Sequence, residues 1–191
     1  MKGRKPWDRP ALSRRTIAPL AFLVGFLVVW RFAQAPELSA SQSEAAAKTA
    51  VLIGRATVVD GDTIRIAGES IRFNGIDAPE SRQTCTDERG TAWRCGADAA
   101  NRLDAYLASS RPTRCVPLSR DQYNRVIADC YRADGQNVAG WLVRNGLALD
   151  WPRFSNGRYR AEQDSAQRAR LGMWRGSFQA PWEWRARRWQ D

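Results

Sequence analysis

The sequence predicts an α+β fold, mainly β-strands with added helices, and three observations support this. Two short runs, Thr63 to Ile66 and Ile71 to Ile76, alternate apolar and polar residues around a turn that contains Gly68, which is a hairpin signal. Residues 96–108 instead carry apolar side chains at helical spacing. Along the chain the predicted order is strand, strand, strand, helix, strand, strand, helix, helix.

The first 35 residues precede the folded domain and indicate export. They hold seven basic residues and one acidic residue, and residues 17–30 carry no charge. This apolar stretch is shorter than the roughly 20 residues of a membrane span and suits a signal peptide. Ala33-Gln34-Ala35 resembles a cleavage site, although Pro36 directly after it disfavours cleavage. An uncleaved membrane anchor and a cleaved signal both stay open, and either places the domain outside the cytoplasm, on the periplasmic side.

The remaining chain divides into a linker, a domain and a tail. Residues 36–49 consist mainly of Ala, Ser, Gln and Glu and read as a flexible linker. The domain then spans residues 50–174, starting with a strand over 51–59, and a Trp/Arg-rich tail follows at 175–191. The net charge is +10, of which the first 35 residues carry +6, so the high isoelectric point is weak evidence for nucleic-acid binding.

The predicted hairpin gathers acidic residues at one rim. Asp62 comes just before its first strand and Asp77 just after its second, with Glu80 three residues further on. Three carboxylates form a hard-oxygen site of the kind that Ca²⁺ or Mg²⁺ prefers, and a nearby Arg72 suits phosphodiester chemistry. Ordinary turn chemistry is the alternative. A two-residue turn would point Arg72 away from Asp62, so we expect a bulge, for example at Gly75.

These residues resemble the thermonuclease, or staphylococcal nuclease-like, family. Its signature hairpin is matched by Asp60-Gly61-Asp62-Thr63, then Arg72, then Asp77-Ala78-Pro79-Glu80. Two further family elements are similar to residues 121–125 and 137–148, so the resemblance covers roughly residues 50–174. It implies an OB-fold, a five-stranded barrel with three helices, which is a fold suited to oligonucleotides.

The resemblance also implies a Ca²⁺ cofactor and a set of site residues. Asp62, Asp77 and the backbone carbonyl of Ala78 would hold the ion, and Glu80 would act as general base. Arg72 and Arg125 would clamp the phosphate, and Tyr123 would help to hold the nucleotide. The family's Thr is replaced by Ala78 and its Gly by Asn124, and a cysteine-bearing insertion replaces a lysine-rich loop after Glu80.

Four cysteines and no histidine limit the chemistry of the chain. In an exported protein four cysteines favour disulfides, and the lack of histidine excludes His-based triads and metal sites. We expect Cys85–Cys95 to staple the insertion. If residues 114–118 and 125–131 are strands around a turn at 121–124, Cys115 faces Cys130, and a cross-strand disulfide is expected there.

The C-terminal third is predicted to be largely helical. Asn137 can cap a helix from Val138 to about Asn145, and a third helix is expected over 159–171. Between them Trp151 lies in a loop, where it could stack on a base or form a partly buried lid. The tail holds Trp and Arg side chains that suit nucleic-acid stacking, membrane contact or packing on the domain, and we favour packing on the domain.

The sequence therefore predicts a monomeric, extracytoplasmic, Ca²⁺-dependent nuclease that hydrolyses DNA and RNA with little sequence specificity and favours single-stranded substrates. The N-terminal segment would contact the membrane, and no protein partner is implied. A non-catalytic nucleic-acid-binding module of the cell envelope is the second hypothesis. A cell-envelope interaction domain that uses the tail is the third.

Overall fold

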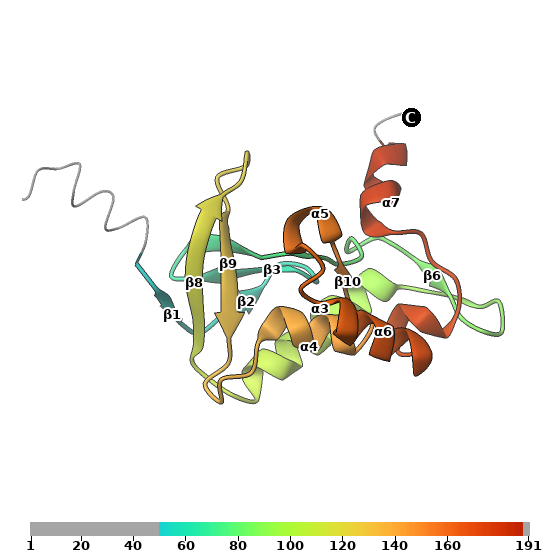
Figure 1. Cartoon of the computed structure of the whole chain (residues 1–191), viewed down its shortest axis with the longest axis horizontal. Coiled ribbons are helices and arrows are strands. Elements are labelled where there is room, and N and C mark those ends of the chain that lie inside the picture. Colours follow the sequence, from blue (N-terminus) through green and yellow to red (C-terminus); the bar gives the residue numbers. More distant parts are fainter. Residues whose placement is uncertain (1–49, 189–191) are drawn as a thin grey trace, which may run out of the picture. The chain divides into compact units, whose positions relative to one another are not determined.

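The computed structural model describes residues 50–188. The strands are β1 (Leu52–Gly54), β2 (Thr57–Val58), β3 (Thr63–Ile66), β4 (Glu69–Phe73), β5 (Ile76–Asp77), β6 (Cys85–Thr86), β7 (Ala92–Trp93), β8 (Thr113–Arg120), β9 (Val126–Tyr131) and β10 (Leu149–Asp150). The helices are α3 (Cys95–Ala108), α4 (Val138–Arg144), α5 (Pro152–Ser155), α6 (Arg160–Arg168), a 3₁₀ turn (Gly172–Arg175) and α7 (Pro181–Arg188). This mixture of strands and helices confirms the predicted α+β class (Figure 1).

The main sheet has six strands in the order β1-β8-β9-β4-β3-β2. Its two outer members, β1 and β2, are halves of the single segment 52–58, which is interrupted at residues 55–56. The first half pairs with β8 and the second half pairs with β3. The hydrogen-bonded pairings therefore run in a closed circuit of five chain segments, as a five-stranded barrel requires.

The hairpin of β3 and β4 closes through a two-residue turn. Ala67 and Gly68 both have positive φ, 51° and 87°, which is the backbone that a tight hairpin turn demands. The predicted second strand over 71–76 is wrong in its last part, because the chain turns at Asn74 and Gly75, where Gly75 has a φ of 76°. Residues 76–77 then form β5, which pairs with β10 in a separate two-stranded sheet.

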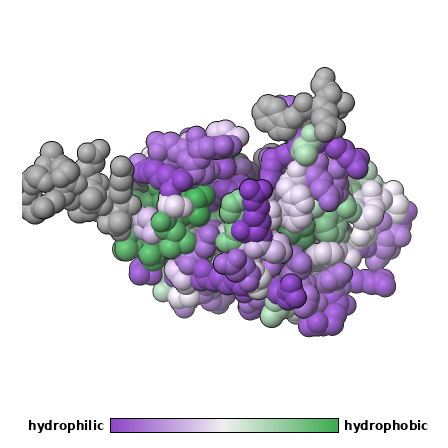
Figure 2. All heavy atoms as spheres, turned by 45° about the horizontal axis from the view of Figure 1, so that its top comes forward, coloured by the Kyte–Doolittle hydropathy of each residue, from purple (hydrophilic) through white to green (hydrophobic). Residues whose placement is uncertain are grey.

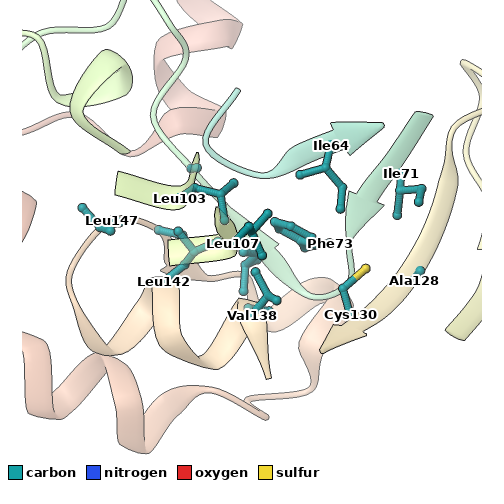
Figure 3. Close-up of a cluster of buried hydrophobic side chains, with 14 of the residues drawn as sticks. Ile64, Ile71, Phe73, Leu103, Leu107, Ala128, Cys130, Val138, Leu142 and Leu147 are labelled. Carbon is teal, nitrogen blue, oxygen red and sulfur yellow. The ribbon is translucent and has the colours of Figure 1, made fainter. Parts of the chain in front are cut away.

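The core fills the space between the main sheet and two helices. Ile64, Ile71 and Phe73 from the strands are at most 1% exposed and pack in one cluster with helix side chains. Leu103 and Leu107 come from α3, and Val138 and Leu142 from α4 (Figure 3). Burying each such side chain contributes about 1.5–3 kcal/mol. The predicted helices over 96–108 and 138–145 are thus present, and the Asn137 side chain caps α4 by accepting from the Gly140 N–H.

The β8–β9 hairpin contains one of the two predicted disulfides. Cys115 lies opposite Cys130 in the sheet and is bonded to it. The pairing shifts between Pro117 and Ser119, so that Arg120 pairs with Val126. The second predicted disulfide, Cys85–Cys95, joins β6 to the start of α3.

The C-terminal third differs from the prediction in two places and agrees with it in a third, the packing of the tail on the domain. The loop expected around Trp151 contains α5, a single helical turn that begins at Pro152. The third helix is shorter than expected, since α6 ends at Arg168. The tail forms α7 and packs on the domain, where Phe178 and Trp182 contact a cluster that includes both Cys85 and Cys95.

The predicted N-terminal segment (1–35) and linker (36–49) lie outside the described residues. Within residues 50–188, the helices are all too short or too polar to span a membrane. Figure 2 shows hydrophobic residues gathered beside the start of the described chain. Exposed apolar side chains on β1 and β8 include Ile53 and Leu118.

Candidate active site

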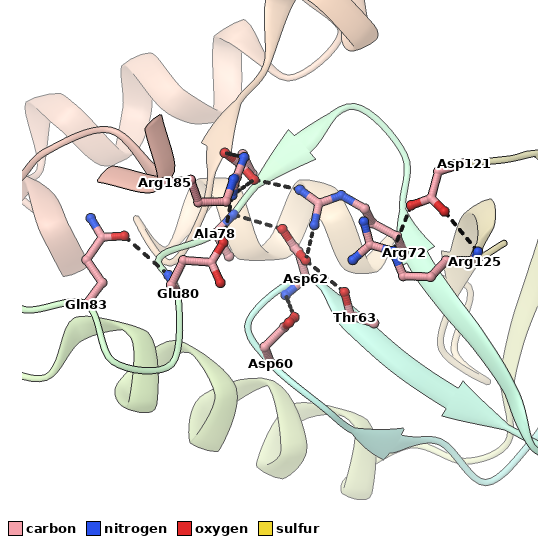
Figure 4. Close-up of polar contacts among 11 residues, drawn as sticks. Asp60, Asp62, Thr63, Arg72, Ala78, Glu80, Gln83, Asp121, Arg125 and Arg185 are labelled. Atoms are coloured by element: carbon pink, nitrogen blue, oxygen red, sulfur yellow. Dashed lines mark hydrogen bonds and ion pairs between the residues drawn. The ribbon is translucent and has the colours of Figure 1, made fainter. Parts of the chain in front are cut away.

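Asp62, Arg72 and Asp77 form a directly connected triad at one end of the hairpin. The Arg72 guanidinium donates from one nitrogen to Asp62 Oδ1 at 2.8 Å and from another to Asp77 Oδ1 at 2.6 Å. The two carboxylates are 4% and 0% exposed, and the arginine side chain is 13% exposed. The arginine thus forms a buried bridge between two carboxylates (Figure 4).

The local fold explains why no bulge within the hairpin is needed for this contact. Thr63 lies opposite Arg72, so Asp62 is at the strand end next to the arginine. The turn at Gly75 then redirects the chain, and β5 carries Asp77 back toward Asp62. The Ala78 N–H donates to Asp62 Oδ2 at 3.1 Å, which ties the two acidic segments together.

Glu80 is positioned by its backbone. Its N–H donates to the side-chain oxygen of Gln83 at 3.2 Å, and Gln83 is fully buried. The first turn of α3 lies against the Glu80 carbonyl, where a Cβ at Gly96 would come within 1.8 Å of that oxygen. Only glycine fits so close an approach. The Glu80 side chain itself is 33% exposed, so it can face both the site and solvent.

Arg125 and Tyr123 project from the β8–β9 turn. Asp121 holds this turn by accepting from the Arg125 N–H at 2.9 Å and from its Nε at 2.7 Å. Figure 4 shows the Arg125 side chain directed toward Arg72. Tyr123 is 68% exposed, and its ring centroid lies 5.6 Å from the Arg125 guanidinium carbon. The turn therefore brings a second arginine and an exposed aromatic ring to the same side of the barrel.

Trp151 belongs to the site through the C-terminal tail. The backbone N–H of Trp151 donates to the Gly75 carbonyl at 2.9 Å, which fixes Trp151 beside the turn that precedes Asp77. Its ring stacks on Trp182 of α7, with centroids 5.8 Å apart and planes 14° apart. Stacking of the Trp151 ring on a nucleotide base, as predicted, would therefore compete with its stacking on Trp182.

Arg185 of α7 completes the site and was not predicted. One of its nitrogens donates to Asp77 Oδ1 at 3.0 Å and to Glu80 Oε1 at 2.8 Å, and the other donates to Asp77 Oδ2 at 2.8 Å. Gln83 links the same tail to the Glu80 loop, because its Nε2 donates to the Gln179 carbonyl at 2.7 Å. The only sequence signal for these contacts was the density of Trp and Arg in the tail.

The charges in the site perturb one another. Burial, followed by repulsion from Asp62, raises the pKa of Asp60 to about 6. Burial also raises the pKa of Asp77, although the hydrogen bond from Arg185 opposes this. Burial alone would lower the pKa of Arg185, but its hydrogen bonds to Asp77 and Glu80 raise it above its usual range.

The acidic side chains of the candidate site suit a hard cation as ligands, although they do not all surround one point. Among residues 50–188, no three acidic, thiol or imidazole side chains converge as a metal-binding group. Glu80 is instead joined to Asp77 through the Arg185 guanidinium. That guanidinium is itself a cation held between two carboxylates. The carboxylate groups offer oxygen ligands, which Ca²⁺ and Mg²⁺ prefer. The residues therefore fit such an ion in charge and chemistry.

Comparison with known families gives an independent result. A family model described as Staphylococcal nuclease homologue matches residues 70–176. This range includes Arg72, Asp77, Glu80 and Arg125. Asp62 lies before it, and α7 lies beyond it.

Curated relatives carry two kinds of name. A Rhizobium meliloti protein named succinoglycan biosynthesis protein ExoI is 48% identical over 124 residues, which cover 65% of this chain and 65% of that protein. An Escherichia coli protein named as an uncharacterized endonuclease is 28% identical over 137 residues, covering 69% of this chain and 82% of the relative. Endonuclease YhcR of Bacillus subtilis is 30% identical over 147 residues, covering 68% of this chain and 12% of the relative.

Proposed function

The chain belongs to the family of staphylococcal nuclease homologues, and from this premise we propose that it is a Ca²⁺-dependent nuclease. It hydrolyses phosphodiester bonds of DNA and RNA with little sequence specificity. The observation that carries the proposal is the Arg72 bridge between Asp62 and Asp77. Two nearly buried carboxylates around one guanidinium place anion-binding and cation-binding groups within a few ångströms of each other, which is what a phosphate with its counterion needs.

In this proposal the acidic residues hold the cofactor and activate water. Asp62, Asp77 and the Ala78 carbonyl bind Ca²⁺, which when bound supplies positive charge to the phosphate oxygens. Glu80 orients and deprotonates the attacking water, and its partial exposure gives water access to it. Its backbone anchors, Gln83 and the first turn of α3, keep the carboxylate near the triad.

The arginines and aromatic residues act on the substrate. Arg72 and Arg125 donate to the phosphate oxygens as negative charge builds up in the transition state, and the planar guanidinium can make two such hydrogen bonds at once. Tyr123 contacts the nucleotide, and Trp151 stacks on an unpaired base. Stacking needs a splayed base, so single-stranded regions are the favoured substrates.

We place this activity outside the cytoplasm. The two disulfides, Cys85–Cys95 and Cys115–Cys130, are compatible with an oxidising compartment. The apolar residues 17–30 either anchor the protein in the membrane or direct its secretion. We also propose that the domain acts as a monomer, with a site whose residues all belong to one chain.

The test is a cleavage assay with the oxidised protein on single-stranded DNA and RNA, in Ca²⁺ or with a chelator. We expect cleavage only with Ca²⁺ and its loss in Asp62→Ala. Asp104→Ala is the matched control, because Asp104 is an exposed aspartate on α3 outside the site. Activity that survives the chelator, or that survives in Asp62→Ala, would contradict the proposal.

One observation favours a second candidate, a non-catalytic nucleic-acid-binding module. Arg185 pairs with both Asp77 and Glu80, which would leave a purely structural network of charges if it never moved. The same assay separates the two candidates, because such a module would bind the oligonucleotides and leave them intact in every divalent ion.

A further inference from the structure

Arg185 occupies the position of a cation in the proposed metal site. Its guanidinium contacts both oxygens of Asp77 and one oxygen of Glu80, at 2.8–3.0 Å. These are the groups that the proposed function assigns to Ca²⁺ and to the attacking water. Asp77 Oδ1 also accepts from Arg72, so arginines contact the carboxylate from two sides.

Helix α7 is held over the site by further contacts besides this ion pair. Trp182, one helical turn before Arg185, stacks on Trp151, and the Arg185 guanidinium carbon lies 5.7 Å from the Trp151 centroid. Pro181 at the start of the helix is buried. Just before α7, the Gln179 carbonyl accepts from the buried Gln83. The tail is therefore docked through a specific surface that includes the loop of Glu80.

Arg185 and a divalent metal ion compete for Asp77 in this arrangement. A carboxylate offers about four lone-pair sites, and two guanidinium groups use three of those of Asp77, two at Oδ1 and one at Oδ2. A divalent ion at the remaining Oδ2 site would lie beside the Arg185 guanidinium, and the repulsion between the two positive charges favours displacement of an arginine. Arg72 is 13% exposed in the middle of a strand pairing, whereas Arg185 is 30% exposed on helix α7, outside the sheet. Arg185 is the one that can leave.

We propose that α7 is an autoinhibitory strap, in which Arg185 fills the divalent-cation site and Trp182 covers the base-stacking face of Trp151. The inference rests on the proposed function, because it assigns a regulator to the same site. Ca²⁺ binding and release of α7 are then coupled, and anything that loosens the helix raises the affinity for Ca²⁺.

The coupling predicts the direction of a binding change. Removing the guanidinium abolishes the competing donor, so Arg185→Gln binds Ca²⁺ roughly 10- to 100-fold more tightly than wild type, the effect of losing charged hydrogen bonds. Trp182→Ala tightens binding for a different reason, since it weakens the docking of the helix and leaves the guanidinium in place. Arg187→Gln changes neither the Ca²⁺ affinity nor the docking of α7. It is the matched control because Arg187 is an exposed arginine on the same helix.

The experiment measures Ca²⁺ affinity and helix docking on the full oxidised chain. Calorimetric titration with CaCl₂ compares wild type with Arg185→Gln, Trp182→Ala and Arg187→Gln. Hydrogen–deuterium exchange of peptides that cover residues 178–188 follows α7, and we expect saturating Ca²⁺ to increase exchange there in the wild type. Neither readout depends on nuclease activity.

The outcomes separate the inference from the proposed function. Tighter binding in both the Arg185 and Trp182 variants, with increased exchange of α7 on Ca²⁺ addition, supports the strap. Equal or weaker binding in Arg185→Gln overturns the strap and leaves the Ca²⁺ site standing. Lack of Ca²⁺ binding by wild type and by Arg185→Gln alike would overturn the metal site itself, and the strap with it.

Discussion

Replacing Arg72 by glutamine tests the charge balance on which the site depends. Its guanidinium is the link between Asp62 and Asp77, at 2.8 and 2.6 Å. In the variant Asp77 keeps Arg185, but Asp62 loses its ion-pair partner while 4% exposed. Breaking a buried ion pair by removing one partner costs about 3–5 kcal/mol. We expect the lower end, about 3 kcal/mol, because Asp62 still accepts from the Ala78 N–H and the Thr63 hydroxyl.

The assay is thermal unfolding followed by circular dichroism, with and without Ca²⁺. A loss of about 3 kcal/mol lowers Tm by roughly 10 °C in a domain of this size. The proposed Ca²⁺ site uses the same carboxylates of the folded state, so Ca²⁺ at 100 times its Kd should restore about 2–3 kcal/mol. Arg65→Gln is the matched control, an exposed arginine on the neighbouring strand β3. An unchanged Tm in chelator would refute the reasoning, since the two carboxylates would then not need Arg72.

Three other substitutions test separate parts of the site. Glu80→Gln should leave oligonucleotide binding intact and cut kcat by about 10²–10⁴, the usual contribution of a general base; single-turnover kinetics would detect a normal rate if Glu80 is a bystander. Partial burial alone would raise the pKa of Asp121, but hydrogen bonds from Arg125 lower it. Ionised Asp121 therefore stabilises the fold at pH values above its unfolded-state pKa. This stabilisation is lost as pH falls through its folded-state pKa. Asp121→Asn should therefore reduce stability by about 0.5–1 kcal/mol at neutral pH, with urea titrations of the two proteins converging as pH falls below the folded-state pKa of Asp121. The double variant Cys115→Ser/Cys130→Ser removes a link across 15 residues and should lower the unfolding free energy by about 3 kcal/mol, whereas a loss below 1 kcal/mol in urea would show that β8 and β9 need no covalent link.

The parts of the site close together in sequence could be predicted, because local rules control them. Alternation placed the hairpin of Thr63 and Arg72, and strand register placed Cys115 opposite Cys130. The route from Arg72 to Asp77 was misjudged. A bulge was expected to re-aim the arginine, but the chain turns at Gly75 and starts a new strand. A glycine at position 75 suits a bulge and a turn alike, so the sequence alone does not distinguish the two.

The role of the tail could not be predicted from local pattern. Arg185 and Asp77 are 108 residues apart, and a single arginine in a short helix shows no periodicity that would point to its partner. Trp182 is similar, since an aromatic residue near a chain end suits a membrane surface, a base or the domain itself. Only the docked helix distinguishes these cases, because it shows which ring Trp182 stacks on.

The two arginines that meet at Asp77 differ in how they are anchored, and this difference has a functional consequence. A site for a divalent ion and a phosphate needs a fixed positive group that binds the phosphate. It also needs a position that the divalent ion can occupy. Arg72 comes from β4, which pairs with strands on both sides, so it cannot withdraw without opening the barrel. Arg185 comes from a helix that follows the last barrel segment by many residues, and it can withdraw with that helix. The first is therefore suited to be the permanent cation of the site, and the second to be the cation that exchanges.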